Sequence, residues 1–266
     1  MKKQIQYRGK KLEYEIKGTG IPVMLVHGFM EDRRIWEPLL HGVENKYSWI
    51  LPDLPGSGGS EHNPELTQLR DFAGSLEAIL ASENISEIAL IGHSMGGYIS
   101  LAFAEKYPEK IRALGLFHST SYPDPPEKKE TRMKSMDFIR ANGALAYIET
   151  AIPGLFSDGF KEEHPEEIQK LVDRYANFTQ ESLVQYLEAM KNRPATTGVL
   201  ETITKPMLFI MGESDKAVPF KDVLEQCHIP QISYIHILTH SAHMGMIEET
   251  SLCNSLIDRF LEQIPL

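Results

Sequence analysis

Ser94 lies in a stretch whose residue types and spacing suggest nucleophilic chemistry. Residues 92–96 read Gly-His-Ser-Met-Gly, a G-x-S-x-G pattern, after the apolar run EIALI and before a helix-like sequence. A serine at a tight strand-to-helix turn has a strained backbone, and side chains two positions to either side would collide. Gly92 and Gly96 remove those side chains. The pattern therefore predicts an exposed serine hydroxyl that acts as a nucleophile.

A serine hydroxyl is a weak nucleophile at neutral pH, so it needs a neighbouring base. The candidate is His243, in the segment THSAHMGMIEE, and His240 and His93 are the alternatives. We favour His243 over His240 because it lies deeper in the loop before the last helix, and we expect His93 to be a packing residue that points away from the serine. The H-x-x-H spacing lacks the E-x-x-H pattern of a helical zinc site, so no metal site is predicted.

The base needs an acid that orients it, and the ends of parallel strands are where such groups gather. Asp215, in PMLFIMGESDKAVP, follows a strand-like apolar run and a glycine turn. Glu213 and Asp222 are rival carboxylates in the same segment. Asp215 produces the chain order serine, aspartate, histidine, which is the order found in enzymes built on this strand-to-helix turn.

Acyl transfer also requires backbone amides that bind the developing oxyanion. The amide of Met95 is one candidate, because it lies at a helix N-terminus, where negative charge is favoured. The segment HGFM after the run PVMLV should supply the other, with the Phe29 amide preferred, the Met30 amide second, and Gly28 allowing close approach of the backbone. One such donor contributes roughly 3–4 kcal/mol to transition-state stabilisation.

These residues require a sheet whose strands end at a common edge. Short apolar runs have the length and β-content of strands buried on both faces. An antiparallel hairpin is predicted over 3–17 and an amphipathic helix over 66–80, where apolar residues recur at helical spacing. Strands alternating with helices predict an α/β fold with a mostly parallel sheet flanked by helices. The apolar runs are residues 22–26, 47–51, 88–92, 113–117, 206–211 and 234–238.

One segment breaks the alternation. The proline-rich sequence SYPDPP is followed by a long stretch of helix-like composition without a strand-like run. We predict a core of residues 1–120 and 200–266 with an inserted helical cap over 121–199, and a separate helical domain is the alternative. Aromatic residues that could line a pocket under the cap include Phe138, Tyr147 and Phe156.

Composition narrows the partners of this chain of 266 residues. It has 37 acidic and 27 basic residues and a formal net charge of −10, so it repels phosphate backbones and anionic lipids. No nucleic-acid or membrane partner is therefore expected. The absence of a secretory-signal pattern or of an apolar run near 18 residues predicts a cytoplasmic location. Cys227 and Cys253 are expected to be reduced thiols, and the oligomeric state stays open.

The segments HGFMEDRRIW, LPDLPGSGGS, GHSMGG, GESDKAVP and SAHMGMIEE, in this chain order, resemble the successive signatures of the alpha/beta-hydrolase superfamily. The resemblance covers residues near 20–120 and 200–266, whereas the cap resembles no known segment. It implies an eight-stranded, mostly parallel sheet and no cofactor. One departure is the sequence EET after His243, where many relatives have a proline, so the last helix is expected to begin differently.

The resemblance also implies roles for individual residues. Asp53, in LPDLPGSGGS, would be structural and brace a loop beside the site. The implied catalytic triad and oxyanion donors are Ser94, Asp215 and His243, with the amides of Phe29 and Met95.

A serine at position 94 suits attack on a carbonyl, whereas haloalkane dehalogenases and epoxide hydrolases use an aspartate there. The leading hypothesis is a serine hydrolase of the carboxylesterase or lactonase kind, which acts on a small acyl substrate through an acyl-enzyme. Carbon–carbon bond hydrolysis, or a cofactor-free haloperoxidase or perhydrolase activity, is an alternative because similar triads serve both. A small-molecule sensor that keeps the triad is an alternative of another class.

Overall fold

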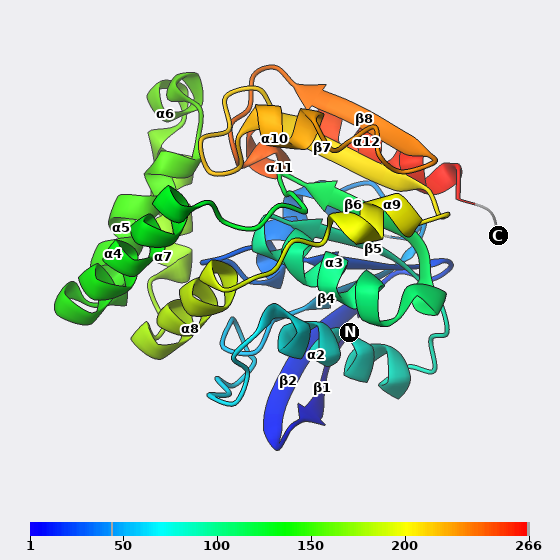
Figure 1. The fold of residues 1–266 in the computed structure, drawn as a ribbon, viewed down its shortest axis with the longest axis horizontal. Coiled ribbons are helices and arrows are strands. Elements are labelled where there is room, and N and C mark those ends of the chain that lie inside the picture. Colours follow the sequence, from blue (N-terminus) through cyan, green and yellow to red (C-terminus); the bar gives the residue numbers. More distant parts are fainter. Residues whose placement is uncertain (44, 265–266) are drawn as a thin grey trace.

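The computed structural model describes residues 1–43 and 45–264. They contain one sheet with the strand order β1-β2-β4-β3-β5-β6-β7-β8 (Figure 1). The pairs β1–β2 and β2–β4 are antiparallel, and all other neighbours are parallel, which confirms the expected eight-stranded, mostly parallel sheet. The strands are β1 Lys2–Tyr7, β2 Lys10–Lys17, β3 Pro22–Val26, β4 Ser48–Pro52, β5 Ile88–His93, β6 Ile111–Phe117, β7 Met207–Gly212 and β8 Ser233–Leu238.

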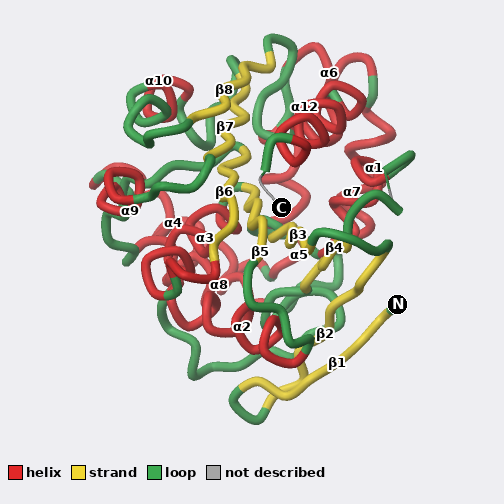
Figure 2. The backbone as a smooth tube through the Cα atoms, turned by 90° about the vertical axis from the view of Figure 1, so that its right-hand side faces the viewer, coloured by secondary structure: helices red, strands yellow, loops and turns green. Residues whose placement is uncertain are grey.

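Helices cover both faces of this sheet. Figure 2 shows the sheet edge-on, with α3, α9 and α10 on one side and α1 and α12 on the other. Short 3-10 helices are η1 Arg33–Trp36, η2 Pro108–Lys110 and η3 Ile152–Leu155. The α-helices are α1 Glu37–Leu40, α2 Leu69–Ser82, α3 Met95–Lys106, α4 Pro126–Asn142, α5 Ala144–Ala151, α6 Asp158–Glu163, α7 Pro165–Tyr175, α8 Gln180–Lys191, α9 Thr197–Thr202, α10 Phe220–Leu224, α11 Gly245–Glu248 and α12 Thr250–Glu262.

The central strands are the apolar runs of the sequence. Every residue of β5 and β7 is buried, because helices cover both faces of a parallel sheet. The outer strand β8 differs from the expectation that it is buried on both faces. Its residues Ile235 and Ile237 are 42% and 44% exposed, since this strand lies at the edge of the sheet and one of its faces is uncovered.

Local signals explain the elements that flank the central strands. The predicted hairpin is formed by β1 and β2, with Arg8 and Gly9 at positive φ in the tight turn. The predicted amphipathic helix is α2, which starts at Leu69 with a capping box between Gln68 and Asp71. Leu66, which we expected in this helix, is buried but lies before it.

The segment between β6 and β7 contains only helices among its ordered elements. Helices α4 to α8 form a group beyond one end of the sheet (Figure 1), whereas α9 packs against α3 of the core. The boundaries 121–199 stay a prediction, and the second of them falls inside α9.

The carboxyl ends of β3, β5, β6 and β7 lie at one edge of the sheet because these strands are parallel neighbours. Cys227 and Cys253 are free cysteines, and both are buried. Within residues 1–43 and 45–264, no helix has both the length and the apolar character that crossing a membrane requires.

Candidate active site

The turn between β5 and α3 carries Ser94 and holds its backbone in a strained conformation. Ser94 has φ 49° and ψ −114°, a conformation that residues with side chains rarely adopt. A Cβ on Gly92 would lie 2.3 Å from the backbone carbonyl carbon of Gly96, and a Cβ on Gly96 would lie 2.2 Å from the carbonyl oxygen of Val26. The requirement for glycine at both positions therefore has a direct steric cause.

Asp215 and His243 are in contact. Nδ1 of His243 lies 2.7 Å from Oδ2 of Asp215, and both side chains are buried. Burial by itself would raise the pKa of Asp215, but the attraction of His243 and hydrogen bonds from His118 and His243 outweigh it and lower that pKa far below its usual range. Asp215 is thus an anion that holds Nδ1, and Nε2 of His243 is left as the nitrogen that can accept a proton.

The other candidates for base and acid lie outside this arrangement. His240 and Glu213 are exposed, and Asp222 lies on α10. His93 has contacts at both ring nitrogens, so it offers no lone pair to the serine. Our expectation that it is a packing residue pointing away from the site was incomplete, because its ring centroid lies 4.9 Å from that of His243.

Ser94 and His243 line the same cavity, which has a volume of about 500 Å³. The structure does not join them directly, since within the described part of the chain Ser94 Oγ has no hydrogen bond. Such catalytic hydrogen bonds are often long before substrate binds and shorten in the reacting complex. The structure thus brings acid and base together and places the serine on the same wall.

The rest of the cavity wall is largely apolar and comes from both core and cap. Among the aromatic cap residues considered from the sequence, Tyr147 lines it, whereas Phe138 and Phe156 do not. Helix α4 adds polar groups that include Lys128 and Arg132. The apolar side chains of the wall include Phe29, Met30, Tyr98, Tyr147, Leu155, Leu187 and Met190.

The Phe29 amide is oriented by its neighbours. Nε2 of His27 accepts a hydrogen bond from the Leu54 amide at 3.0 Å, so Nδ1 carries the ring proton and donates to the Gly28 carbonyl oxygen at 2.9 Å. The Gly28 carbonyl and the Phe29 amide belong to one planar trans peptide, so they point in opposite directions. The Phe29 N–H therefore points away from His27, and the side chain of Phe29 lines the cavity.

Met95 begins α3 directly after Ser94, so its amide is one of the helix N-terminal amides that have no partner inside the helix. The Met95 side chain is buried and is not part of the cavity wall. Met30, the second choice of donor in the HGFM segment, lines the cavity and has φ 61°. Met30 and Ser94, one on each of the two turns that face the cavity, are therefore both among the non-glycine residues at positive φ.

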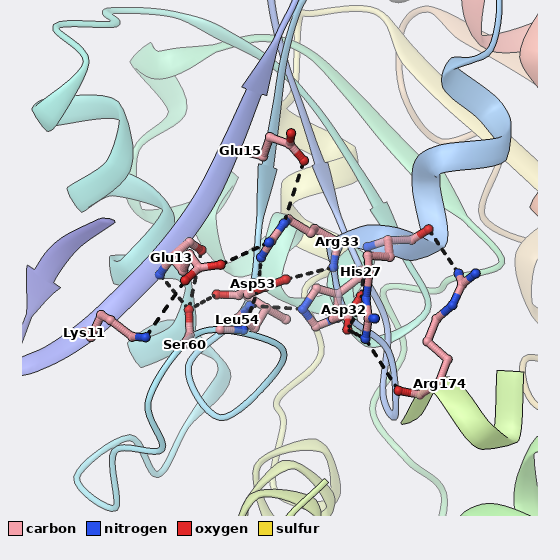
Figure 3. Close-up of polar contacts among 12 residues, drawn as sticks. Lys11, Glu13, Glu15, His27, Asp32, Arg33, Asp53, Leu54, Ser60 and Arg174 are labelled. Carbon is pink, nitrogen blue, oxygen red and sulfur yellow. Dashed lines mark hydrogen bonds and ion pairs between the residues drawn. The ribbon is translucent and has the colours of Figure 1, made fainter. Parts of the chain in front are cut away.

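Asp53 lies at the centre of a buried polar network beside the turn after β3 (Figure 3). Its Oδ1 accepts from the Arg33 amide at 3.0 Å and its Oδ2 from the Gly59 amide at 2.7 Å, and the carboxylate is ion-paired with the Arg33 guanidinium. Ser60 Oγ donates to the Asp53 carbonyl oxygen at 2.7 Å. The network joins the loop after β4 to the segment after Phe29, which fits the structural role implied for Asp53.

His118 is a site residue that the motifs did not reveal. It directly follows β6, is fully buried and has φ 49°. Nδ1 lies 3.3 Å from Oδ2 of Asp215, and Nε2 accepts from the Gly245 amide at 3.2 Å. Burial lowers the pKa of His118 to about 4, so the ring is neutral near pH 7. The available signal was its position, since a polar residue at the carboxyl end of a parallel strand is a candidate site residue.

The side chains of His118, Asp215 and His243 also form a group whose possible ligand atoms lie within 4.8 Å of one another. These distances alone would allow the group to bind a metal ion. The same atoms are, however, engaged in hydrogen bonds, because Nδ1 of each histidine faces the Asp215 carboxylate. We interpret the group as a hydrogen-bonded network around the acid.

Glu248, in the EET segment, organises the loop that carries the base. Its Oε1 accepts from the amides of Ala242 and Met244, at 3.0 and 3.1 Å, and its Oε2 accepts from the Ser157 amide at 2.8 Å. A short helix, α11, precedes α12 in this segment. Sequence reasoning recorded the acidic run without recognising that it binds the amides on both sides of His243.

The fold and this geometry agree with comparisons to known proteins. Residues 21–250 match the family model described as the alpha/beta hydrolase fold. The chain therefore belongs to the alpha/beta hydrolase family, and the curated and structural neighbours of this family support hydrolase activity.

Two relatives illustrate the range of similarity. A pimeloyl-[acyl-carrier protein] methyl ester esterase from Legionella pneumophila (strain Paris) is 24% identical over 92% of this chain and 97% of its own length. The structure of a thermophilic esterase from Thermogutta terrifontis, with malate bound, has a TM-score of 0.92 and 28% identity, covering 99% of each chain.

A third comparison concerns the fold alone. The enol-lactonase from Burkholderia xenovorans LB400 has a TM-score of 0.89 at 20% identity and covers 98% of this chain and 100% of its own. The shared architecture supports the assignment of the fold, while activity has to be argued from the site.

Proposed function

We propose that this protein is a serine hydrolase that cleaves a small carboxylic ester or lactone through an acyl-enzyme at Ser94. The observation that carries the proposal is the 2.7 Å contact between Asp215 and His243 at a cavity that Ser94 also lines from a strained turn. Relatives named as esterases support the same class of reaction.

The acylation step uses the free nitrogen of His243. Ser94 Oγ attacks the carbonyl carbon of the substrate while its proton passes to Nε2, and the anionic Asp215 stabilises the imidazolium through Nδ1–H. The carbonyl oxygen becomes an oxyanion, for which we assign the amides of Phe29 and Met95 as donors. The tetrahedral intermediate then collapses, and the leaving alkoxide takes the proton from Nε2, which produces an alcohol and an acyl-serine.

Deacylation reverses the proton transfers. Nε2 of His243 takes a proton from water, whose oxygen attacks the acyl carbon, and a second tetrahedral intermediate forms in the same oxyanion site. Its collapse releases a carboxylic acid and returns the proton to Ser94 Oγ. For a lactone substrate, the alcohol and the acid leave as one hydroxy acid.

The cavity supports a small acyl substrate as the partner. Its volume of about 500 Å³ lies within the range of roughly 300–1,000 Å³ that is usual for small-molecule sites. The predominantly apolar wall suits an acyl chain, and the cap helices supply part of this wall.

The test is the variant Ser94→Ala, assayed with p-nitrophenyl esters of increasing chain length and labelled with a fluorophosphonate probe. We expect the wild type to turn over repeatedly and to be labelled at Ser94, and the variant to lose both properties while keeping its circular dichroism spectrum. Substantial residual ester turnover by the purified variant would refute the assignment of the nucleophile.

The same assay separates the alternatives. Wild-type protein that cleaves a vinylogous dione but no ester would favour carbon–carbon bond hydrolysis. A single turnover followed by a ligand-dependent change in cap protection would favour a sensor over an enzyme.

A further inference from the structure

His93 is bonded through both of its ring nitrogens to hydrogen-bond acceptors. Nδ1 lies 3.0 Å from Oε2 of Glu31, and Nε2 lies 2.9 Å from the backbone carbonyl oxygen of His243. A neutral imidazole carries one ring proton and can donate through one nitrogen only. With Glu31 ionised, as its lowered pKa indicates, both contacts are hydrogen bonds only if the His93 ring carries two protons.

The other buried histidines around the site differ in this respect. His27 faces the Leu54 amide, a donor, with Nε2, and His118 faces the Gly245 amide with Nε2. His243 faces a carboxylate with Nδ1 alone. None of these rings faces an acceptor with both nitrogens, and Nδ1 of His118, which faces Asp215, also lies 3.2 Å from the Gly212 amide nitrogen, a donor.

Glu31 needs a cation as its neighbour. Its side chain is 3% exposed, its Oε2 also accepts from the Gly28 amide at 2.6 Å, and its Oε1 has no hydrogen bond within the described part of the chain. A carboxylate buried in this way is costly unless an opposite charge lies beside it. Its ion pair among the described residues is the one with His93.

We infer that His93 is an imidazolium ion held in a buried ion pair with Glu31, and that this pair positions the two loops that complete the catalytic site. Glu31 binds the Gly28 amide, next to the Phe29 amide assigned to the oxyanion, and His93 binds the backbone of His243. The positioning role rests on the proposed function, whereas the charge of His93 does not.

The surroundings of the pair agree with this charge state. Burial by itself would lower the pKa of His93 and raise that of Glu31, but their mutual attraction and hydrogen bond outweigh burial, so the pKa of His93 is raised and that of Glu31 is lowered. Other titratable groups near the pair are His27, His118, Tyr175, Asp215 and His243, and the rings of Trp36 and Phe117 contact the His93 ring edge-on.

The ion pair of Glu31 and His93 leaves no room for a side chain at position 28, which is a glycine. A Cβ at this position would lie 2.8 Å from Nδ1 of His93 and 3.0 Å from Oε2 of Glu31. The glycine of the HGFM segment is therefore coupled by contact to the ion pair, and a side chain there would force the two charges apart.

The charge state is tested by NMR of the full chain labelled with ¹⁵N-histidine, with the His93 signals assigned by their loss in His93→Gln. At about pH 8, well above the ordinary histidine pKa of about 6.5, we expect both nitrogens of His93 to be protonated and His27 and His118 to carry one proton each. An unprotonated nitrogen in His93 at this pH would overturn the ion pair, whatever the protein catalyses.

The positioning role is tested by Glu31→Gln, which keeps the shape and removes the charge. We expect His93 to lose one ring proton and kcat for a p-nitrophenyl ester to fall about 10- to 100-fold, with KM nearly unchanged, because small displacements of catalytic groups cost this much. Glu31→Asp should recover part of kcat and the doubly protonated ring. Glu37→Gln, at an exposed position in α1, is the matched control and should keep wild-type kinetics.

These experiments distinguish failure of the positioning role from failure of the proposed hydrolase function. Unchanged kcat in Glu31→Gln would refute the positioning role while the wild type remains an esterase. If Glu31→Gln does not fold, the NMR measurement on the wild type and the kcat of Glu31→Asp decide. A wild-type kcat in Glu31→Asp would count against the positioning role if the NMR spectrum shows that His93 has lost one ring proton in this variant. Ester turnover that survives Ser94→Ala would refute the proposed function and leave the NMR result intact.

Discussion

The turn that carries Ser94 and the loop that carries His243 are held in different ways. The Ser94 amide donates to the Phe117 carbonyl oxygen at 2.9 Å, and Ser119 Oγ donates to the Ser94 carbonyl oxygen at 2.8 Å, so its contacts come from the strand end next to β5. The His243 amide instead donates to the carbonyl oxygen of Leu155, in η3, at 2.9 Å.

The loop that carries His243 therefore depends on η3, far along the segment between β6 and β7, whereas the turn that carries Ser94 is held by residues at the end of β6 and directly after it. Glu248 strengthens this dependence because one carboxylate binds the amides beside His243 and the amide of Ser157. The difference teaches that Ser94, the proposed nucleophile, is placed by the sheet and its glycines, while His243, the proposed base, is placed by contacts between distant segments. Perturbations on the base side should accordingly have larger effects than comparable ones on the nucleophile side.

The largest effect is expected for Asp215→Asn. An asparagine would present a donor to Nδ1 and favour the wrong tautomer of His243, so we expect kcat to fall on the order of 10³–10⁴-fold with the fold retained. Steady-state ester hydrolysis measures this loss, with Asp222→Asn, on α10, as the matched control. A loss below tenfold, or a larger loss in the control, would move the role of the acid to another carboxylate.

The next effect concerns stability and pH on the base side. The pKa of His118 is lowered by burial from 6.5 to about 4, so its contribution to stability is fully present above about pH 6.5 and is lost as the pH falls to about 4, where the unfolded chain has bound the proton first. A shift of this size corresponds to roughly 3 kcal/mol. Urea unfolding across this range should show a steeper loss for the wild type than for His118→Asn. Parallel curves for the two proteins would contradict the buried neutral state of His118.

The smallest effects compare one hydrogen-bonding side chain from each region. Glu248→Gln places an amide donor against a backbone amide, and an unsatisfied donor costs about 1–3 kcal/mol, so we expect a lower melting temperature and a drop in kcat. Ser119→Ala should change kcat less, because the Ser94 carbonyl oxygen still accepts from the Gly97 amide at 2.9 Å. Equal losses in kcat for the two variants would remove the distinction between the regions.

Much of the fold was readable because its signals are local. Buried parallel strands are continuous apolar runs, and β3 occupies the predicted residues 22–26, while the other central strands differ by one or two residues at their ends. The exposed side of β8 was misjudged, because burial depends on what packs against a residue and not on its own type. Leu66 was wrongly placed in α2, because its apolar spacing continues the helical pattern beyond the capping box at Gln68.

The site was readable where a motif reflects one turn, and it was not where a contact joins distant segments. Gly92, Ser94 and Gly96 lie within a single turn, so their steric relation is present in the spacing. Glu31 and His93 are 62 residues apart, and no local pattern indicates that they meet.

The amino-acid sequence alone determined the fold class and the strained serine turn, because apolar runs and short-range sterics are local. It also led us to propose Asp215 and His243, from the order of these residues along the chain and their places after strand-like runs. Only the tertiary structure decided which histidines are neutral and which face two acceptors, that Glu248 binds the amides beside the base, and which cap side chains line the cavity. The physical reason is that protonation, hydrogen-bond partners and burial are properties of neighbours in space, and those neighbours are far apart along the chain.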